Sequence, residues 1–402
     1  MASPNSITAF PASRAEGLRR LASFVPHAGR DYAAGRGTDN GPGQHSHVSM
    51  MSPYLRYRLV TEREVVRAVL SRHSLQAAEK YVQEVLWRTY WKGWLEMRPA
   101  AWQLFMAERD KERVQFPDVR ALQSAESGTT GIDGFDDWTQ QLVQTGYLHN
   151  HARMWFASIW IFTLRLPWAL GADFFLRHLL DADAASNTLS WRWVAGLQTA
   201  GKIYLADADN IARYTNGRFS PKGLAVRADA LTEAPLPPPA TLPFVATADP
   251  GKPSLLMITP EDMNPESFIP AAPYIKAALI AADPQHLWGD TAAAFVSAAA
   301  NDMCDRVQNH YKCPCEIITA LDAAVLRAAA QKAGATQIIM PYAPVGPVAD
   351  ALDKLSLNLS QAGITLVQIR RSWDTRFWPH AQKGFFPFKE KIPVELGKEG
   401  LL

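Results

Sequence analysis

Apolar residues recur at helical spacing along residues 1–225. Residues 15–30 and 61–95 show this periodicity most clearly, with frequent Arg, Glu and Ala among the apolar positions. Thr61 is followed by acidic residues, an arrangement typical of a helix start. Residues 138–146 repeat the pattern and end at a glycine. Since no strand pattern appears in this part of the chain, we predict an all-helical domain.

Two further segments extend this helical pattern. Residues 151–166, HARMWFASIWIFTLRL, are apolar on nearly every side, which predicts a buried helix. Residues 171–185, GADFFLRHLLDADAA, are predicted to continue in the same conformation.

The pattern changes after residue 225. Residues 226–253 are rich in Pro and Ala and are predicted to be a linker. In residues 254–402 short apolar runs alternate with helical segments, which predicts an α/β domain on a parallel, doubly wound sheet. The predicted strands are 253–259, 315–319, 336–342 and 364–370, and the predicted helices are 291–311, 322–334 and 348–363. Residues 276–282, KAALIAA, fit a strand or a helix equally well. No Gly-x-Gly-x-x-Gly follows a strand, so the dinucleotide-binding fingerprint is absent.

Charge and tryptophan are unevenly distributed. Residues 1–230 contain 27 Lys and Arg against 22 Asp and Glu, a net +5, whereas residues 231–402 contain 14 against 17, a net −3. Ten of the 13 tryptophans lie in the first of these segments. This composition suits base stacking or single-strand binding, and it suits a large aromatic core equally well.

The sequence also indicates the cellular compartment. No apolar run reaches the ~20 residues of a membrane span, and residues 1–20 lack the apolar core of a secretory signal. The three cysteines are Cys304, Cys313 and Cys315, and an odd, small number predicts a reducing, cytoplasmic setting. Cys313 and Cys315 lack the further ligands of a four-coordinate site, so no metal is expected.

Four short stretches combine polar and aromatic residues in apolar surroundings. In LLDADAASNTLSWRW, residues 179–193, two aspartates and an asparagine precede two tryptophans. Buried carboxylates require paired charge or hydrogen bonds, so these side chains should have partners. The other three stretches are SHVSMMSPYLRY (46–57), KYVQEVLWRTYW (80–91) and TGYLHNHARM (145–154).

In this order the four stretches resemble the flavin-binding domain of the photolyase/cryptochrome superfamily, over roughly residues 15–220. The resemblance implies an all-α FAD-binding domain with hydroxyls near a helix start for the phosphates. It implies that Asp183 meets the flavin ring edge, that Asp181 pairs with Arg153, and that Asn187 faces flavin N5, as in members that keep the flavin reduced. The full set of implied FAD contacts is Tyr32, Ser49, Met51, Ser52, Tyr81, Glu84, Arg88, Tyr147, Asn150, Arg153, Asp181, Asp183 and Asn187.

The resemblance also implies a DNA surface. Its residues are Arg36, Trp87, Asn150, Met154 and Trp193. Trp87 and Trp193 would form two walls of a pocket for a flipped pyrimidine dimer, and Glu84 would bond the adenine side of the flavin and the lesion base. Taken alone, Glu84 fits an ordinary i,i+4 pair with Arg88 on a solvated helix face. His151 replaces an arginine that touches DNA phosphate in the family.

Trp191 and Trp168 match the first two members of the family's photoreduction chain. With Glu84 and Asn187 they make up the expected catalytic residues. The third, surface member falls at Phe116, and phenylalanine is too hard to oxidise for this role. Either photoreduction is poor or the electron path continues through another residue, for which the candidates are Trp138, Trp155 and Trp160.

Residues 254–402 resemble the superfamily's antenna domain. The matching stretches are LLMITPEDMNPE, AGATQIIMPYAP and WPHAQKGFFPFKEKIP. Ordinary photolyases begin with that domain, so the resemblance implies a circular permutation; an unrelated α/β domain is the alternative. The presence and identity of a second, antenna chromophore stay open.

The resemblance implies a blue-light-driven DNA photolyase in which reduced FAD donates an electron to a cyclobutane pyrimidine dimer. Its partner would be dimer-containing DNA, single- or double-stranded, with no membrane. One alternative is a cryptochrome-like photoreceptor without repair, which Phe116, His151 and the Tyr-for-Trp changes favour. Another is a flavin-binding relic that neither repairs nor signals.

Overall fold

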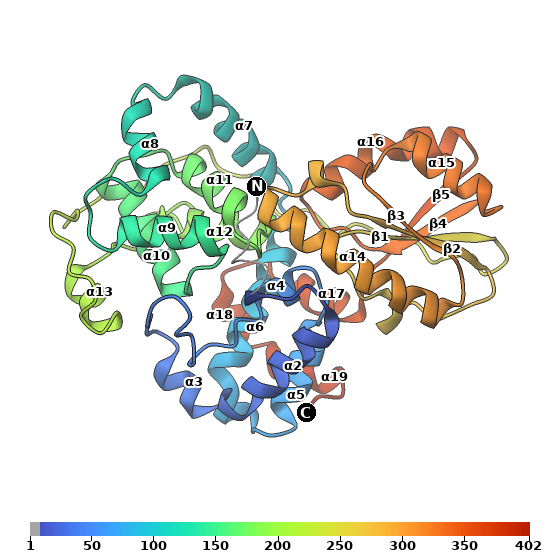
Figure 1. The fold of residues 1–402 in the computed structure, drawn as a ribbon, viewed down its shortest axis with the longest axis horizontal. Coiled ribbons are helices and arrows are strands. Elements are labelled where there is room, and N and C mark those ends of the chain that lie inside the picture. The colour runs from blue at the N-terminus through green and yellow to red at the C-terminus, as the bar shows by residue number, and fades with distance from the viewer. Residues whose placement is uncertain (1–8) are drawn as a thin grey trace.

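The computed structural model describes residues 9–402; of the N-terminal segment predicted to lack a secretory signal, residues 1–8 lie outside the described residues. Figure 1 shows a helical half and a half built on a β-sheet, side by side. Within residues 9–402, no helix has the length and hydrophobicity that crossing a membrane would require.

The all-helical part of the chain is confirmed. Its helices are α2 (Arg14–Phe24), α3 (Arg30–Gly35), α4 (Ser52–Arg56), α5 (Glu62–Leu70), α6 (Leu75–Glu96), α7 (Ala100–Gln115), α8 (Val119–Ser127), α9 (Phe135–Thr145), α10 (Asn150–Ser158), α11 (Trp168–His178), α12 (Ala184–Val194) and α13 (Ala208–Tyr214). Thr61 caps α5 as expected, because its side chain accepts from the Glu64 N–H while the Glu64 carboxylate accepts from the Thr61 N–H. Gly146 ends α9 with a φ of 68°, which glycine adopts without strain.

The apolar segment after residue 150 is buried, as its sequence predicts, but it is not one regular helix. Helix α10 passes at Ile159 into a π-helical turn, Ile159–Thr163, before the chain bends into α11. The expected continuous helix over residues 171–185 is wrong, because α11 ends at His178. Asp183 instead caps α12, its side chain accepting from the Ser186 N–H at 2.7 Å.

The parallel sheet is confirmed in the second half. Its strands are β1 (Ser254–Ile258), β2 (Ile275–Ala281), β3 (Cys315–Ile318), β4 (Gln337–Pro341) and β5 (Thr365–Ile369). All pairs are parallel and the order is β3-β2-β1-β4-β5. The ambiguous KAALIAA segment is strand β2, with Ile280 on one face of the sheet and Leu279 on the other.

Helices cover both faces of this sheet (Figure 1). Helix α14 (Asp290–Tyr311) packs on the face that carries Leu256 and Ile280, and this face joins the core of the helical half. Helices α15 (Ala323–Lys332) and α16 (Pro347–Gln361) pack on the opposite face in a separate, smaller core.

The chain after β5 returns to the helical half. Helices α17 (Ser372–Phe377), α18 (Phe385–Lys389) and α19 (Ile392–Lys398) lie beside α5 and α6 (Figure 1). Trp373 donates its indole N–H to Thr89 at 3.0 Å. A side chain at Gly93 would place its Cβ 2.8 Å from the Cα of Trp378, so glycine allows this close approach to α6.

Candidate functional site

The first aspartate of the LLDADAASNTLSWRW stretch forms the ion pair that the resemblance implies. Asp181 is buried, and both of its oxygens lie 3.2 Å from the guanidinium of Arg153. Burial raises the pKa of Asp181, but Arg153 and Arg88 together bring it below the usual value. The carboxylate therefore stays charged in an apolar interior.

The charged form of Asp183 is stabilised more strongly than that of Asp181. Besides capping α12, its carboxylate lies 2.9 Å from Arg88 Nη1 and 3.1 Å from Lys92 Nζ. Burial opposes ionisation, but Lys92, Arg88 and Arg56 hold the pKa of Asp183 well below its usual range. One helix face of α6 thus supplies two cations to a carboxylate on the α11–α12 loop.

The simple reading of Glu84 as the i,i+4 partner of Arg88 is wrong. Arg88 points to Asp183, and Glu84 pairs with Arg36 from the end of α3. Burial raises the pKa of Glu84, while Arg36 lowers it in part. Long-range partners therefore determine the geometry of both side chains.

A buried group of charges connects this site to the sheet half, and we call it the interdomain ion cluster. Arg56 pairs with Glu261 after β1 through two contacts of 3.0 and 2.8 Å. Arg58 pairs with Asp374 through two contacts of 2.7 Å. The cluster consists of two networks that share no ion pair: Arg56, Arg88, Lys92, Asp183 and Glu261 form one, and Arg58, Glu62, Asp262, Arg371 and Asp374 form the other. No local pattern predicts it, because the paired residues lie up to 316 positions apart.

Some residues implied to hold FAD have buried polar atoms without a hydrogen-bond partner. The hydroxyls of Ser52 and Tyr81 are buried and form no hydrogen bond of good geometry among residues 9–402, although Ser52 lies near Asp181 and Tyr81 near Ser49. The Nε2 of His149, which the resemblance does not assign to the cofactor, is also buried without a partner in this part of the chain. Buried polar groups are normally satisfied, so such atoms fit a polar ligand. FAD carries hydroxyl, phosphate and ring groups that can bond such atoms. The donor set therefore fits this cofactor.

The remaining predicted cofactor residues lie at different depths. Tyr32, Met51, Tyr147 and Asn187 are buried, Ser49 is half-buried, and Asn150 is exposed at the start of α10. The Nδ2 of Asn187 donates to the Ala172 carbonyl at 2.8 Å. Within the described residues nothing donates to its amide oxygen, which is left for a ligand.

The two tryptophans expected to wall a DNA pocket both have aromatic partners within the chain. Trp87 stacks on Phe385 of α18 with ring centroids 3.7 Å apart and planes 11° apart. Trp193 stacks on Tyr204 at 5.6 Å. Of the other predicted DNA residues, Arg36 is tied to Glu84 and Met154 is half-buried.

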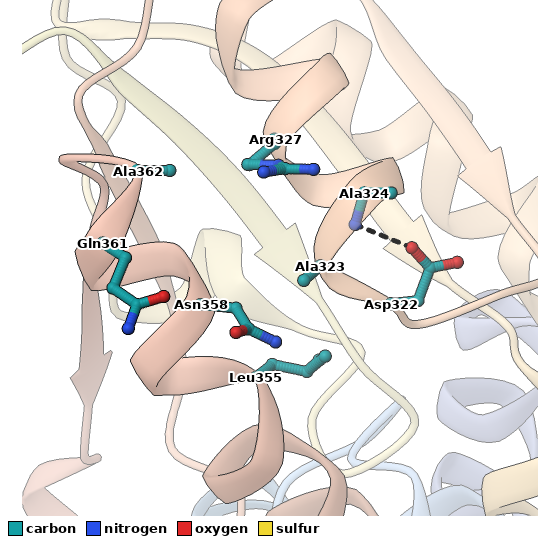
Figure 2. Close-up of a pocket in the computed structure, with 8 residues that line it drawn as sticks. All are labelled: Asp322, Ala323, Ala324, Arg327, Leu355, Asn358, Gln361 and Ala362. Atoms are coloured by element: carbon teal, nitrogen blue, oxygen red, sulfur yellow. Dashed lines mark hydrogen bonds between the residues drawn. The ribbon is translucent and has the colours of Figure 1, made fainter.

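The predicted electron carriers are buried in separate aromatic surroundings. Trp191 lies edge-on to Trp160 at 6.2 Å, and Trp168 lies 5.7 Å from Phe105. Phe116 is half-buried at the end of α7. Elsewhere, Figure 2 shows a pocket between the start of α15 and the second half of α16, and no predicted site residue lines it.

Comparison with known proteins bears on the helical half. Residues 81–222 match the family model described as the FAD binding domain of DNA photolyase. A deoxyribodipyrimidine photo-lyase of Streptomyces griseus is 36% identical over 153 residues, which are 38% of this chain and 33% of that protein. A deoxyribodipyrimidine photo-lyase of Alkalihalophilus pseudofirmus is 28% identical over 211 residues, which are 52% of this chain and 43% of that protein.

Among solved structures, a bacterial class III photolyase of Agrobacterium tumefaciens aligns with a TM-score of 0.45 and 25% identity, over 54% of this chain and 46% of that chain. This chain spans 33% and 43% of the length of the two curated relatives. The family match, from Tyr81 on, spans three of the four motif stretches and, with these relatives, confirms the resemblance of the helical half to the FAD-binding domain of the photolyase/cryptochrome superfamily.

Proposed function

We propose that this chain is a blue-light-driven, FAD-dependent DNA photolyase that splits cyclobutane pyrimidine dimers. The observation that carries the proposal is Asn187, a buried amide whose nitrogen is fixed to the Ala172 carbonyl and whose oxygen is free for a ligand. An amide at this position is typical of members that keep the flavin reduced for repair. When bound, FAD would supply the light-driven electron.

The chain's own residues would bind the cofactor and position the lesion. Ser52 and Tyr81 offer unpaired hydroxyls to the dinucleotide. Asp183 offers its charged carboxylate to the N–H on the ring edge, and the Asp181–Arg153 pair fixes the neighbouring loop. Glu84, held by Arg36, would hydrogen-bond the adenine side of the flavin and the lesion base, as the resemblance implies.

We propose a division of the chain into the FAD-binding part, residues 1–225, the linker, residues 226–253, and an antenna-like α/β part, residues 254–402. In support, the strands begin at Ser254 and no helix or strand lies between α13 and β1 in the described residues. Helices α17–α19 belong to the last part by sequence and pack on the first in space.

A repair assay tests the proposal. FAD-loaded, chemically reduced protein is illuminated with an oligonucleotide that contains one cyclobutane dimer, in single- and double-stranded form. We expect light-dependent loss of dimers, with no loss in the dark. An unchanged dimer content under light, with the flavin bound and reduced, would refute the proposal. The visible spectrum of the same sample reports bound flavin and any second chromophore.

One observation favours the photoreceptor alternative. Trp87, an expected wall of the lesion pocket, is covered by Phe385 at 3.7 Å. A protein that repairs DNA has to expose this ring or use it from the edge, whereas a photoreceptor has no such need. Under the alternative, illumination would reduce the flavin without changing the dimer content of the oligonucleotide.

A further inference from the structure

A row of aromatic rings leads from Trp168 to the sheet half. The centroid of Trp168 lies 5.7 Å from Phe105, Phe105 lies 5.5 Å from Trp102, and Trp102 lies 5.5 Å from Trp288. These are ordinary contact distances between aromatic rings. Trp102 is fully buried on α7, and Trp288 is half-buried just before α14. The row therefore runs from the helical interior toward the surface of the other half.

Two indoles of this row donate to carboxylates. Trp168 Nε1 lies 3.0 Å from Glu108, and Trp102 Nε1 lies 2.9 Å from Asp350. Loss of an electron makes an indole a cation with an acidic N–H, which a carboxylate stabilises by attraction and by sharing the proton. A buried indole N–H needs only a hydrogen-bond acceptor, which can be neutral. The other indole hydrogen bonds of the described residues do end on neutral oxygens; their donors are Trp155, Trp160 and Trp373.

The three tryptophans that the sequence offers as continuations of the electron path, Trp138, Trp155 and Trp160, do not lead on from Trp168. Trp160 contacts Trp191, but its other ring neighbours in the described chain are Phe156 and Phe174. Trp138 and Trp155 stack on each other at 5.4 Å, and in the described residues neither ring contacts Trp168. Neither route offers a further oxidisable ring on the way to the surface from Trp168.

Two cations lie near the row and oppose a positive charge on it. Arg192 is 5.9 Å from the ring of Trp168, and Arg109 is 5.7 Å from that of Trp288. Each is paired with a carboxylate of its own, Arg192 with Glu233 and Arg109 with Asp110. The negative charge of each carboxylate opposes this repulsion.

We propose that Trp102 and Trp288 continue the electron path from Trp168 into the sheet half, in place of the residue missing at Phe116. Trp191 gives one electron to the photo-excited flavin and is refilled from Trp168; Trp168 is refilled from Trp102 across the ring of Phe105, and Trp102 from Trp288. The electron gained by the photo-excited flavin is balanced by one that a soluble thiol gives to oxidised Trp288. The indole protons stay shared with Glu108 and Asp350. The path rests on FAD binding in the proposed function and does not depend on DNA repair.

Photoreduction of the FAD-loaded protein in the presence of a thiol is the first test. Trp102→Phe and Trp288→Phe should lose photoreduction, whereas Trp155→Phe, a buried tryptophan outside the row, should keep it. Asp350→Asn keeps a hydrogen-bond acceptor for Trp102 and removes only the negative charge, so it should slow photoreduction. This variant keeps the test available if Trp102→Phe does not fold. If Trp288→Phe and Asp350→Asn photoreduce the flavin at the wild-type rate, the proposed path is wrong.

A second test needs neither flavin nor DNA. The apoprotein is oxidised in solution by a ruthenium(III) polypyridyl complex, formed from the ruthenium(II) complex by light with persulfate as the electron acceptor, and oxidised tryptophans are mapped by mass spectrometry. We expect oxidation at half-buried Trp288 and at buried Trp168, with the Trp168 product lost in Trp288→Phe and kept in Trp155→Phe. Equal oxidation of Trp168 in wild type and Trp288→Phe would refute the coupling. Dimer repair is measured separately on chemically reduced wild type, so its failure refutes the proposed function and leaves this path standing.

Discussion

Arg58 provides the sharpest test of what the interdomain ion cluster contributes to stability. Its side chain is buried and contacts three carboxylates, Asp374 at 2.7 Å, Asp262 at 3.3 Å and Glu62 at 3.4 Å. Arg58→Ala removes the cation and leaves the backbone strain unchanged, because alanine carries the same Cβ at its positive φ of 51°. Of the three carboxylates, Asp262 keeps a second cation, Arg371.

The expected loss in the free energy of unfolding comes from the two carboxylates that Arg58→Ala would leave without a cation. In the described residues, Asp374 and Glu62 have no ion pair besides Arg58. Breaking a buried pair by removing one partner costs about 3–5 kcal/mol. An unfolding entropy of ~2.1 cal/mol/K per residue gives ~0.8 kcal/mol/K for this chain, so Tm should fall by about 4–6 °C.

Thermal unfolding at neutral pH, followed by circular dichroism and calorimetry, measures this shift. Arg19→Ala is the matched control, because its ion pair with Glu16 lies on the surface and such pairs add little stability. If Arg58→Ala and Arg19→Ala melt at the same temperature, the cluster contributes no net stability and the reasoning from burial is wrong.

Four further predictions concern the site and its surroundings. Glu84→Ala should lower the yield of repaired dimers while the flavin spectrum shows that FAD stays bound; an unchanged yield would contradict its role. Trp191→Phe should block photoreduction while chemically reduced protein still splits dimers, and normal photoreduction would contradict the path. Burial raises the pKa of Glu96 to about 6, so the native state binds a proton more tightly than the unfolded chain, and the stability that Glu96 contributes should fall by about 2 kcal/mol as pH rises from about 4 to about 7. Buried aspartates such as Asp183 change stability in the opposite direction, so the measurement is the difference between wild type and Glu96→Gln, which urea unfolding at both pH values should show to fall by this amount. Phe385→Ala should uncover Trp87, seen as stronger quenching of tryptophan fluorescence by acrylamide; equal quenching would show that the ring is not shielded by this contact.

Local patterns in the sequence predicted the elements of the fold well. Alternating apolar runs located most of the strands, and the caps at Thr61 and Gly146 marked helix ends, because both signals depend on neighbouring residues. The loop before Asp183 was missed, since its apolar residues keep a helical spacing although the aspartate starts a new helix. The π-helical turn at Ile159–Thr163 leaves no distinct pattern either.

Contacts between distant residues were not predictable in the same way. The Asp181–Arg153 pair followed from the family resemblance. The pairing of Glu84 with Arg36, and the stacking of Phe385 on Trp87, join residues that no periodicity relates. The contact between Trp102 and Trp288 could not be predicted from the sequence either, because it depends on how α7 packs against the segment before α14.

The composition of the interdomain ion cluster has a consequence for how this protein can be taken apart. Its members in the helical half are Arg56, Arg58, Arg88, Lys92, Glu62 and Asp183, four cations and two anions, a net +2. Its members in the sheet half are Arg371, Glu261, Asp262 and Asp374, one cation and three anions, a net −2. Each half alone would carry an unbalanced charge on a surface that is largely buried in the whole molecule. The two halves are thus not interchangeable modules, and a fragment ending in the linker would need compensating mutations at this surface to stay folded.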